Sequence, residues 1–168
     1  PLQRRIRRFY EYYLERKSVF SIESILHEVS STLKHELCDH FFGDIVSDVP
    51  FFQGRDPSFV ALVCLKLEPF FMEAGEFVCR KGVIGTELYF LRKGSVHLRV
   101  AGSAIKVDGG RLFEGACFGH EMLLVNVRQQ WDVQAVTYCE LLYLSKEAFQ
   151  QLTPSYPGLR KELLDAAA

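Results

Sequence analysis

The strongest constraint on the fold is a change of residue pattern near Glu68. Before this point, apolar residues recur at intervals of three and four, as they do along one face of a helix. After it, glycines at 75, 82, 85, 94, 102, 109, 110, 115 and 119 interrupt short runs rich in β-branched and aromatic residues. Closely spaced runs of this kind predict the antiparallel strands of a barrel or jelly roll. We therefore expect an α+β chain, with a helical segment over residues 1–67 and a β jelly-roll barrel with flanking helices over 68–168.

The helical segment is expected to contain four or five short helices. Ser21 is suited to cap the second and Ser31 or Thr32 begins the third, which should end at Gly43. A short fourth helix follows over 44–47, and Pro57 suits the first turn of a fifth. Helices this short cannot close a core among themselves, so the following domain or another subunit must cover their apolar faces. The stripes on the first two helices comprise Leu2, Ile6, Phe9, Tyr10, Tyr13 and Leu14, then Ile22, Ile25, Leu26 and Val29.

Beyond Glu68 the expected strands cover 76–80, 87–92, 95–100, 104–107, 131–137 and 138–144. The alternation is clearest around His97, where Val96, Leu98 and Val100 should face inward and His97 outward into solvent. Ser145 should cap a helix that runs through Leu152, and a final helix should start near residue 158.

Charge is unevenly distributed along an almost neutral chain. Twenty basic and twenty-one acidic residues give a formal net charge of −1, which provides no case for a nucleic-acid partner. The basic residues Arg4, Arg5, Arg7, Arg8, Arg16 and Lys17 face only Glu11 and Glu15 before Ser18. This excess is typical of a solvated helix face; a surface beside a membrane or an acidic partner is the alternative.

The cysteines indicate a reducing compartment. The chain has five, at positions 38, 64, 79, 117 and 139, an odd number without CxxC spacing, so neither a disulfide framework nor a zinc site is expected. The sequence contains no signal peptide and no apolar run near the ~18 residues that span a bilayer. Because it starts at Pro1 and stops at Ala168 within helix-like patterns, we expect a fragment of a longer protein with membrane segments elsewhere.

Several motifs occur in an order and spacing that resemble the cyclic-nucleotide-binding domain. They are Gly82-Val83-Ile84-Gly85-Thr86-Glu87-Leu88-Tyr89-Phe90, then Gly94, Phe118-Gly119 and Ala135-Val136-Thr137-Tyr138-Cys139. The preceding segments 9–13, 24–28, 50–52 and 56–60 look like the C-linker of hyperpolarisation-activated (HCN) and related cyclic-nucleotide-gated channels. Together the two resemblances span nearly the whole chain.

Residues 117–133 have the outline of a phosphate-binding cassette but lack its charges. In the family, a Glu directly after Phe-Gly holds the ribose hydroxyl, and an Arg followed by Thr or Ser holds the cyclic phosphate. With Leu123-Leu124 and Val133 as anchors, these positions fall on His120, Gln129 and Gln130, and Arg128 lies one place too early. Glutamine donates hydrogen bonds but carries no charge. The expected degenerate pocket comprises Phe118, Gly119, His120, Glu121, Met122, Arg128, Gln129, Gln130 and Trp131.

Three of these residues allow two interpretations each. Trp131 is either an aromatic packed on a strand or a plug that fills the empty pocket, a role that the C-terminal helix could also take. His120 is either a polar residue at a helix start or a pH sensor, since the unperturbed pKa of histidine is about 6.5. Arg128 is either a surface cation or a substitute for the missing Arg.

The resemblance implies a cytoplasmic regulatory and tetramerisation module of a voltage-gated-type cation channel, with a pore domain upstream. It would bind cAMP or cGMP weakly at best, without any other cofactor or metal. One alternative is a working cyclic-nucleotide sensor, in which Glu121 and Arg128 compensate for the lost charges; another is a purely structural assembly domain. No supporting motif accompanies a Ser/His/Asp or Cys/His arrangement, so we expect no enzyme. The residues expected between subunits are Ile6, Phe9, Tyr13, Ile22, Ile25 and Val29.

Overall fold

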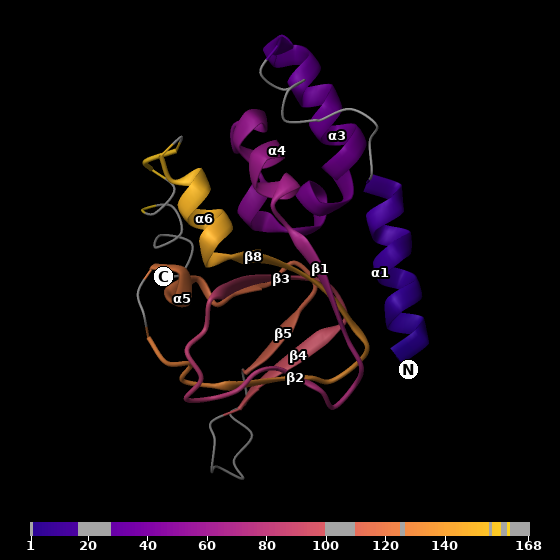
Figure 1. The fold of residues 1–168 in the computed structure, drawn as a ribbon, viewed down its shortest axis with the longest axis vertical. Coiled ribbons are helices and arrows are strands. Elements are labelled where there is room, and N and C mark those ends of the chain that lie inside the picture. Colours follow the sequence, from indigo (N-terminus) through magenta and orange to yellow (C-terminus); the bar gives the residue numbers. More distant parts are fainter. Residues whose placement is uncertain are drawn as a thin grey trace.

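The computed structural model describes residues 2–16, 28–99, 110–124, 127–154, 156–158 and 161. A helical layer lies above two stacked β-sheets, and a further helix runs along their side (Figure 1). The helices are α1 (Leu2–Arg16), α3 (Ser31–Asp48), the 3₁₀ turn η1 (Pro50–Phe52), α4 (Pro57–Leu65), α5 (His120–Leu124) and α6 (Lys146–Leu152). The strands are β1 (Glu68–Met72), β2 (Phe77–Cys79), β3 (Glu87–Lys93), β4 (Ser95–Arg99), β5 (Arg111–Phe113), β6 (Cys117–Phe118), β7 (Asp132–Ala135) and β8 (Cys139–Ser145).

The two sheets form an antiparallel jelly-roll sandwich. One has the strand order β1-β8-β3-β6 and the other β2-β7-β4-β5. Among the described strands, every ladder is antiparallel and joins strands of the same sheet, so the barrel is a sandwich of two sheets rather than a ring closed by hydrogen bonds. The expected α+β fold class is confirmed.

Strand β3 is buried on both faces and joins the helical layer to the sandwich. Leu88 and Phe90 face the helices, and the Phe90 ring lies 5.6 Å from that of Phe51 and 5.2 Å from that of Phe52. Tyr89 and Leu91 face the opposite sheet. A strand that is covered on both faces has apolar residues on both faces. This explains why polar and apolar residues do not alternate along β3. The helical layer therefore obtains its cover from the following domain of the same chain.

Local capping chemistry sets several helix boundaries where they were expected. The Asp56 side chain accepts a hydrogen bond from the backbone N–H of Phe59 at the start of α4, and Ser145 accepts one from Ala148 at the start of α6. The first helix is also confirmed as α1. The second expected helix and the strand at 104–107 lie wholly or mostly outside the described residues, as does the helix expected beyond 158.

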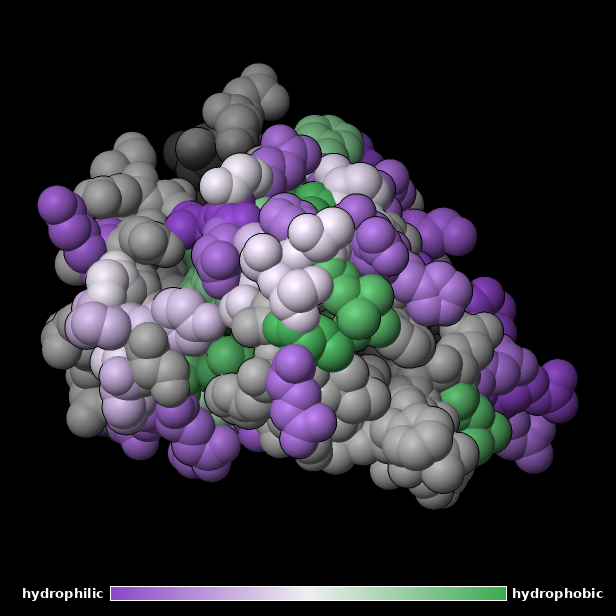
Figure 2. All heavy atoms as spheres, turned by 90° about the horizontal axis from the view of Figure 1, so that it is seen from above, coloured by the Kyte–Doolittle hydropathy of each residue, from purple (hydrophilic) through white to green (hydrophobic). Residues whose placement is uncertain are grey.

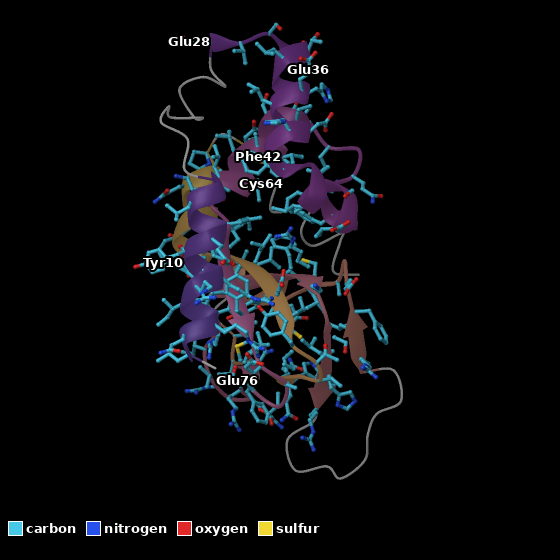
Figure 3. The ribbon with its side chains drawn as sticks, turned by 90° about the vertical axis from the view of Figure 1, so that its right-hand side faces the viewer. Tyr10, Glu28, Glu36, Phe42, Cys64 and Glu76 are labelled. Carbon is cyan, nitrogen blue, oxygen red and sulfur yellow. The ribbon has the colours of Figure 1, made fainter. Side chains whose placement is uncertain are left out.

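The predicted helix end at Gly43 is wrong. Helix α3 continues through Gly43 to Asp48, so the separate helix expected at 44–47 is its last turn. A glycine inside a helix costs roughly 0.5–1 kcal/mol relative to alanine. Phe42 and Ile45, on either side of it, are both buried in the core, and burying such side chains contributes roughly 1.5–3 kcal/mol each. Figure 3 shows Phe42 beside Cys64, where α3 packs on α4.

Three arginines of the basic run on α1 contact carboxylates of their own chain while they remain partly exposed to solvent. Arg4 pairs with Glu73, Arg5 with Glu76 at 3.3 Å and Arg8 with Glu140 at 2.7 Å. The Arg8 guanidinium also lies 4.5 Å from the centre of the Tyr138 ring. The acidic surface that these arginines meet thus belongs to the β-sandwich, and Figure 3 shows Glu76 near the N-terminal end of α1.

Several apolar side chains of α1 remain exposed. Ile6 and Phe9 are 48% and 41% exposed, and Leu2, Tyr10 and Leu14 are exposed with them. Of the other residues predicted to lie between subunits, Val29 is half-buried, Tyr13 belongs to α1 although its side chain is not described, and Ile22 and Ile25 lie outside the described residues. At the α3 end of the molecule, by contrast, hydrophobic side chains form small separate groups among hydrophilic ones (Figure 2). Across the described residues, no helix is long and apolar enough to cross a membrane.

Candidate functional site

A cavity of about 650 Å³ opens at one end of the sandwich. Its wall runs from the end of β1 through the turn at Gly75 and along β2, and then along the loop 80–85 to β3. Met122 from α5 and Gln129 complete it. The lining is largely apolar, with side chains from Met72, Phe77, Val78, Val83, Ile84, Tyr89 and Met122. This size and character are those of a small-molecule site.

Two glycines of the predicted motifs shape the base of the cavity. A Cβ atom on Gly85 would overlap the Met122 sulfur, so only glycine lets this side chain lie across the loop. Gly119 has φ of +92°, and a Cβ there would lie 2.7 Å from the Glu87 carbonyl oxygen. Together these residues bring the start of α5 against β3. Phe118, one residue earlier, is buried and stacks on Tyr89 with ring centres 5.4 Å apart.

Gln129, at the position expected for the phosphate Arg, lines the cavity and is held in place from two sides. Its backbone N–H donates to the Val83 carbonyl at 2.8 Å, and its own carbonyl accepts from the Gly82 N–H at 2.8 Å. The side-chain Nε2 donates to the Cys79 sulfur at 3.5 Å. An uncharged amide directed at a thiol therefore occupies the end of the cavity where a phosphate would need a cation.

The charges around this end are mainly negative. Glu87 lines the cavity, where its carboxylate accepts hydrogen bonds from the hydroxyl and backbone N–H of Thr86. Burial, followed by the nearby carboxylates of Glu87 and Asp132, raises the pKa of the Cys79 thiol to about 12, although the Gln129 amide opposes this shift. Burial and the Glu87 carboxylate also raise the pKa of the Tyr89 hydroxyl. Burial is the main reason that both groups favour their neutral forms, and the Glu87 carboxylate adds to the shift in each case.

Arg80 carries the single positive charge among the described residues that line the cavity, and it lies over an aromatic ring. Its guanidinium carbon lies 3.5 Å from the centre of the Phe77 ring. Glu76, the second carboxylate of the lining, pairs with Arg5 of α1. Its carboxylate also accepts the backbone N–H of Glu73 at 2.8 Å. The turn that carries Glu73 and Glu76 therefore connects the cavity to α1.

Several predicted pocket residues lie outside the cavity lining. Arg128, Gln129, Gln130 and Trp131 line a neighbouring groove with Lys81 and Gly82, and the Arg128 guanidinium donates to the Gly82 carbonyl at 2.7 Å. Of the nine predicted residues, all of them described, only Met122 and Gln129 line the cavity itself.

His120 and Glu121 begin α5, where Glu121 is exposed and His120 is half-buried. Burial lowers the pKa of the His120 imidazole, and the Glu121 charge opposes this shift. The neutral form of His120 is therefore favoured near neutral pH, as expected for a polar residue at a helix start. The sensor interpretation stays a prediction.

Trp131 does not fill the cavity. Its side chain is 40% exposed and belongs to the neighbouring groove, immediately before β7. The interpretation of Trp131 as a plug is therefore wrong. The C-terminal helix proposed as the other plug lies almost wholly outside the described residues.

The sequence analysis missed the charged and aromatic residues of β2 and β3 that line the cavity. Strands were expected at β2 and at β3. However, an inward-facing side chain of a sandwich strand can lie either in the core or in the cavity wall, and the alternation of polar and apolar residues does not distinguish these positions. The missed residues are Glu76, Phe77, Cys79, Arg80, Glu87 and Tyr89.

Residues 69–156, more than half of the chain, match the family model described as the cyclic nucleotide-binding domain. The chain belongs to this family. The resemblance seen in the sequence is thereby confirmed, and the cavity described above lies within the matched domain.

The similarity extends beyond the matched domain. The chain is 33% identical over 95% of its length to the human potassium/sodium hyperpolarization-activated cyclic nucleotide-gated channels 4 and 3, and 31% identical to channel 2 of the mouse. It spans 13%, 20% and 18% of these relatives, respectively. A solved structure of the C-linker/CNBHD of zELK channels, crystallised in the presence of cAMP, shares the fold. The TM-score is 0.64 and the sequence identity is 20%, and the match covers 87% of this chain and 73% of the zELK chain.

The exposed position of Trp131 predicts its spectroscopic behaviour. Because it is the single tryptophan, its fluorescence should show the red-shifted emission of a partly solvated indole and strong quenching by acrylamide. Trp131→Ala should lower the free energy of unfolding by less than about 1 kcal/mol, as is usual for surface positions. Phe90→Ala is the positive control and should cost about 3–5 kcal/mol. A blue-shifted emission protected from acrylamide would contradict this placement.

Proposed function

We propose that the chain is the cytoplasmic regulatory segment of a voltage-gated-type cation channel whose cavity binds cAMP and cGMP weakly or not at all. The observation that carries this proposal is Gln129, an uncharged amide turned to Cys79 at the phosphate end of the cavity. Losing a desolvated, charge-assisted contact to a phosphate costs roughly 2–5 kcal/mol. That is a loss of tens- to thousands-fold in affinity.

The neighbouring charges support weak nucleotide binding independently of Gln129. The Glu87 carboxylate lines the cavity and Asp132 lies close to Cys79, so an incoming phosphate would meet two negative charges. Asp132 is also fixed by accepting the backbone N–H of Lys81 at 2.7 Å. Both carboxylates act on Cys79, the hydrogen-bond partner of Gln129, which supports the proposal of weak phosphate binding there.

A working nucleotide sensor would need Arg128 and Glu121 to replace the missing contacts. The Arg128 guanidinium is bonded to the Gly82 carbonyl in the outer groove, and Glu121 is exposed outside the cavity lining. This geometry gives the sensor alternative little support. The third possibility, a purely structural assembly domain, differs from the proposal only in whether the domain changes channel gating, and recordings from a channel without the domain would separate the two.

The contacts of α1 support a regulatory role in which the linker helix changes its position on the sandwich. Glu76 lines the cavity and pairs with Arg5, while Glu140 on β8 pairs with Arg8. Exposed ion pairs of this kind contribute only about 0.2–1 kcal/mol each. Small contributions of this size allow two arrangements of the helix on the sandwich to interconvert, as a gating equilibrium requires.

Nucleotide titration by calorimetry tests the ligand part of the proposal. Wild-type protein should show a dissociation constant for cAMP and cGMP weaker than micromolar, because Gln129 carries no charge to neutralise the phosphate. Gln129→Arg should tighten binding by at least about tenfold, and adding Gln130→Thr and His120→Glu should tighten it further.

Gln150→Arg is the matched control, since it adds the same charge on the exposed side of α6. Its affinity should equal that of the wild type. Micromolar or tighter binding by the wild-type protein would overturn the proposal of a degenerate site.

We also propose that α1 takes part in assembly of a homotetramer. Its exposed apolar residues line a groove against β1 that contains one charged side chain, Arg5; the apolar lining residues are Leu2, Ile6, Phe9, Tyr10, Pro69, Phe70 and Phe71. A contiguous apolar surface on a soluble domain marks an interaction site. A symmetric oligomer would bury this surface on every subunit.

Sedimentation velocity tests this assembly. The wild-type protein should form dimers or tetramers at high concentration, and Ile6→Glu should shift it to monomer because a charge would enter the apolar contact. Val136→Glu, at an exposed valine on the sandwich, is the control and should leave the association unchanged. A wild-type protein that stays monomeric at every concentration would count against the stripe as an interface.

A further inference from the structure

We propose that the cavity of the β-sandwich binds a planar apolar organic cation, with the ammonium group beside Glu87 and the apolar body between the methionine and aromatic side chains of the lining. This inference rests on the same cavity as the proposed function and names the ligand class that the altered site would accept. It arises from the combination of an apolar cavity with carboxylates at its inner end.

The walls suit a flat apolar body. The thioethers of Met72 and Met122 and the rings of Phe77 and Tyr89 surround a volume of about 650 Å³. Methionine sulfur packs favourably against aromatic rings and adapts to their shape. The Arg80 guanidinium already covers one face of the Phe77 ring, 3.5 Å from its centre, so this ring serves the ligand as an apolar wall rather than as a second cation site.

The charges select the sign of the ligand. Glu87 and Glu76 are the two carboxylates of the lining, and Arg80 is its single cation among the described residues. Glu76 has a partner in Arg5 on the side of α1, whereas Glu87 bonds to the hydroxyl and backbone N–H of its neighbour Thr86. Both Thr86 groups are uncharged donors, so they do not neutralise the negative charge of Glu87.

The behaviour of the neighbouring groups agrees with this charge distribution. Burial and the carboxylates of Glu87 and Asp132 raise the pKa of Cys79, and Glu87 also contributes to the raised pKa of Tyr89. Burial is the main cause of both shifts and disfavours charge of either sign, whereas the Glu87 contribution disfavours negative charge alone. A positive charge beside the Glu87 carboxylate is attracted to it, and more strongly where water is partly excluded.

Three indoles of nearly equal shape test the ligand class by calorimetry or ligand-observed NMR. Tryptamine is a cation, tryptophol is neutral and indole-3-acetate is an anion. The wild-type protein should bind tryptamine most tightly, at least about tenfold more tightly than indole-3-acetate, with tryptophol between them. Equal binding of the three, no detectable binding of tryptamine, or a preference for the anion would each overturn the proposal.

Variants identify the group responsible. Glu87→Gln should lower tryptamine affinity about tenfold and leave tryptophol affinity unchanged, because only the charge is removed. Glu147→Gln is the matched control on the exposed start of α6 and should change neither. An unchanged tryptamine affinity in Glu87→Gln would remove Glu87 from the proposal.

Gln129→Arg provides a second test if the Glu87 variant does not fold, since a positive charge at the inner end should weaken tryptamine and strengthen indole-3-acetate. An unchanged order of affinities in this variant would contradict the inferred field. Failure of this inference is distinguishable from failure of the proposed function: micromolar cAMP binding by the wild type overturns the latter, whatever the order of the three indoles.

Discussion

The burial of β3 on both of its faces is the constraint on which the rest of the structure depends. Leu88 and Phe90 close the helical layer, and Tyr89 closes the sandwich and forms part of the cavity wall. One strand thus fixes how α4 sits on the sheet and how wide the cavity is. Because cores are packed as densely as crystals, a shift of this strand to accommodate a ligand would be felt in the helices above it.

The features that the sequence predicted correctly are those set by local chemistry. The start of α4 at Pro57 and the cap of α6 at Ser145 depend on residues at most three positions apart, and the glycines of the nucleotide-domain motif permit close backbone approach. The features it missed depend on distant partners. Strand β1 contains Pro69 and an aromatic run without alternation, and its ladder with β8 decides its structure; β5 and β6 are short and exist only through their pairing with β4 and β3.

The candidate site was predictable in part for the same reason. Gln129 could be placed from sequence register alone, and it does line the cavity. The interpretation that Trp131 fills the cavity was wrong, because the sequence just before a strand does not show on which side of the sheet an aromatic ring will lie. The carboxylates could not be assigned to the cavity from the sequence, because Glu76 approaches it from the turn before β2 and Glu87 from the start of β3. Glu76 also meets an arginine 71 positions away. Charge at a site is a property of the assembled sandwich rather than of any motif.

The central claim is that the inner end of the cavity favours positive over negative charge, and Cys79 is a natural probe of that field. The most direct measurement compares the rates at which cationic trimethylammonioethyl and anionic sulfonatoethyl methanethiosulfonates modify Cys79, resolved from the other cysteines by peptide mass mapping. The quantity compared is the rate with the cationic reagent divided by the rate with the anionic reagent. For Cys79 this ratio should exceed that of 2-mercaptoethanol by about tenfold or more, the factor expected from about 1.4 kcal/mol of electrostatic preference. A ratio equal to or below that of the free thiol would contradict the account.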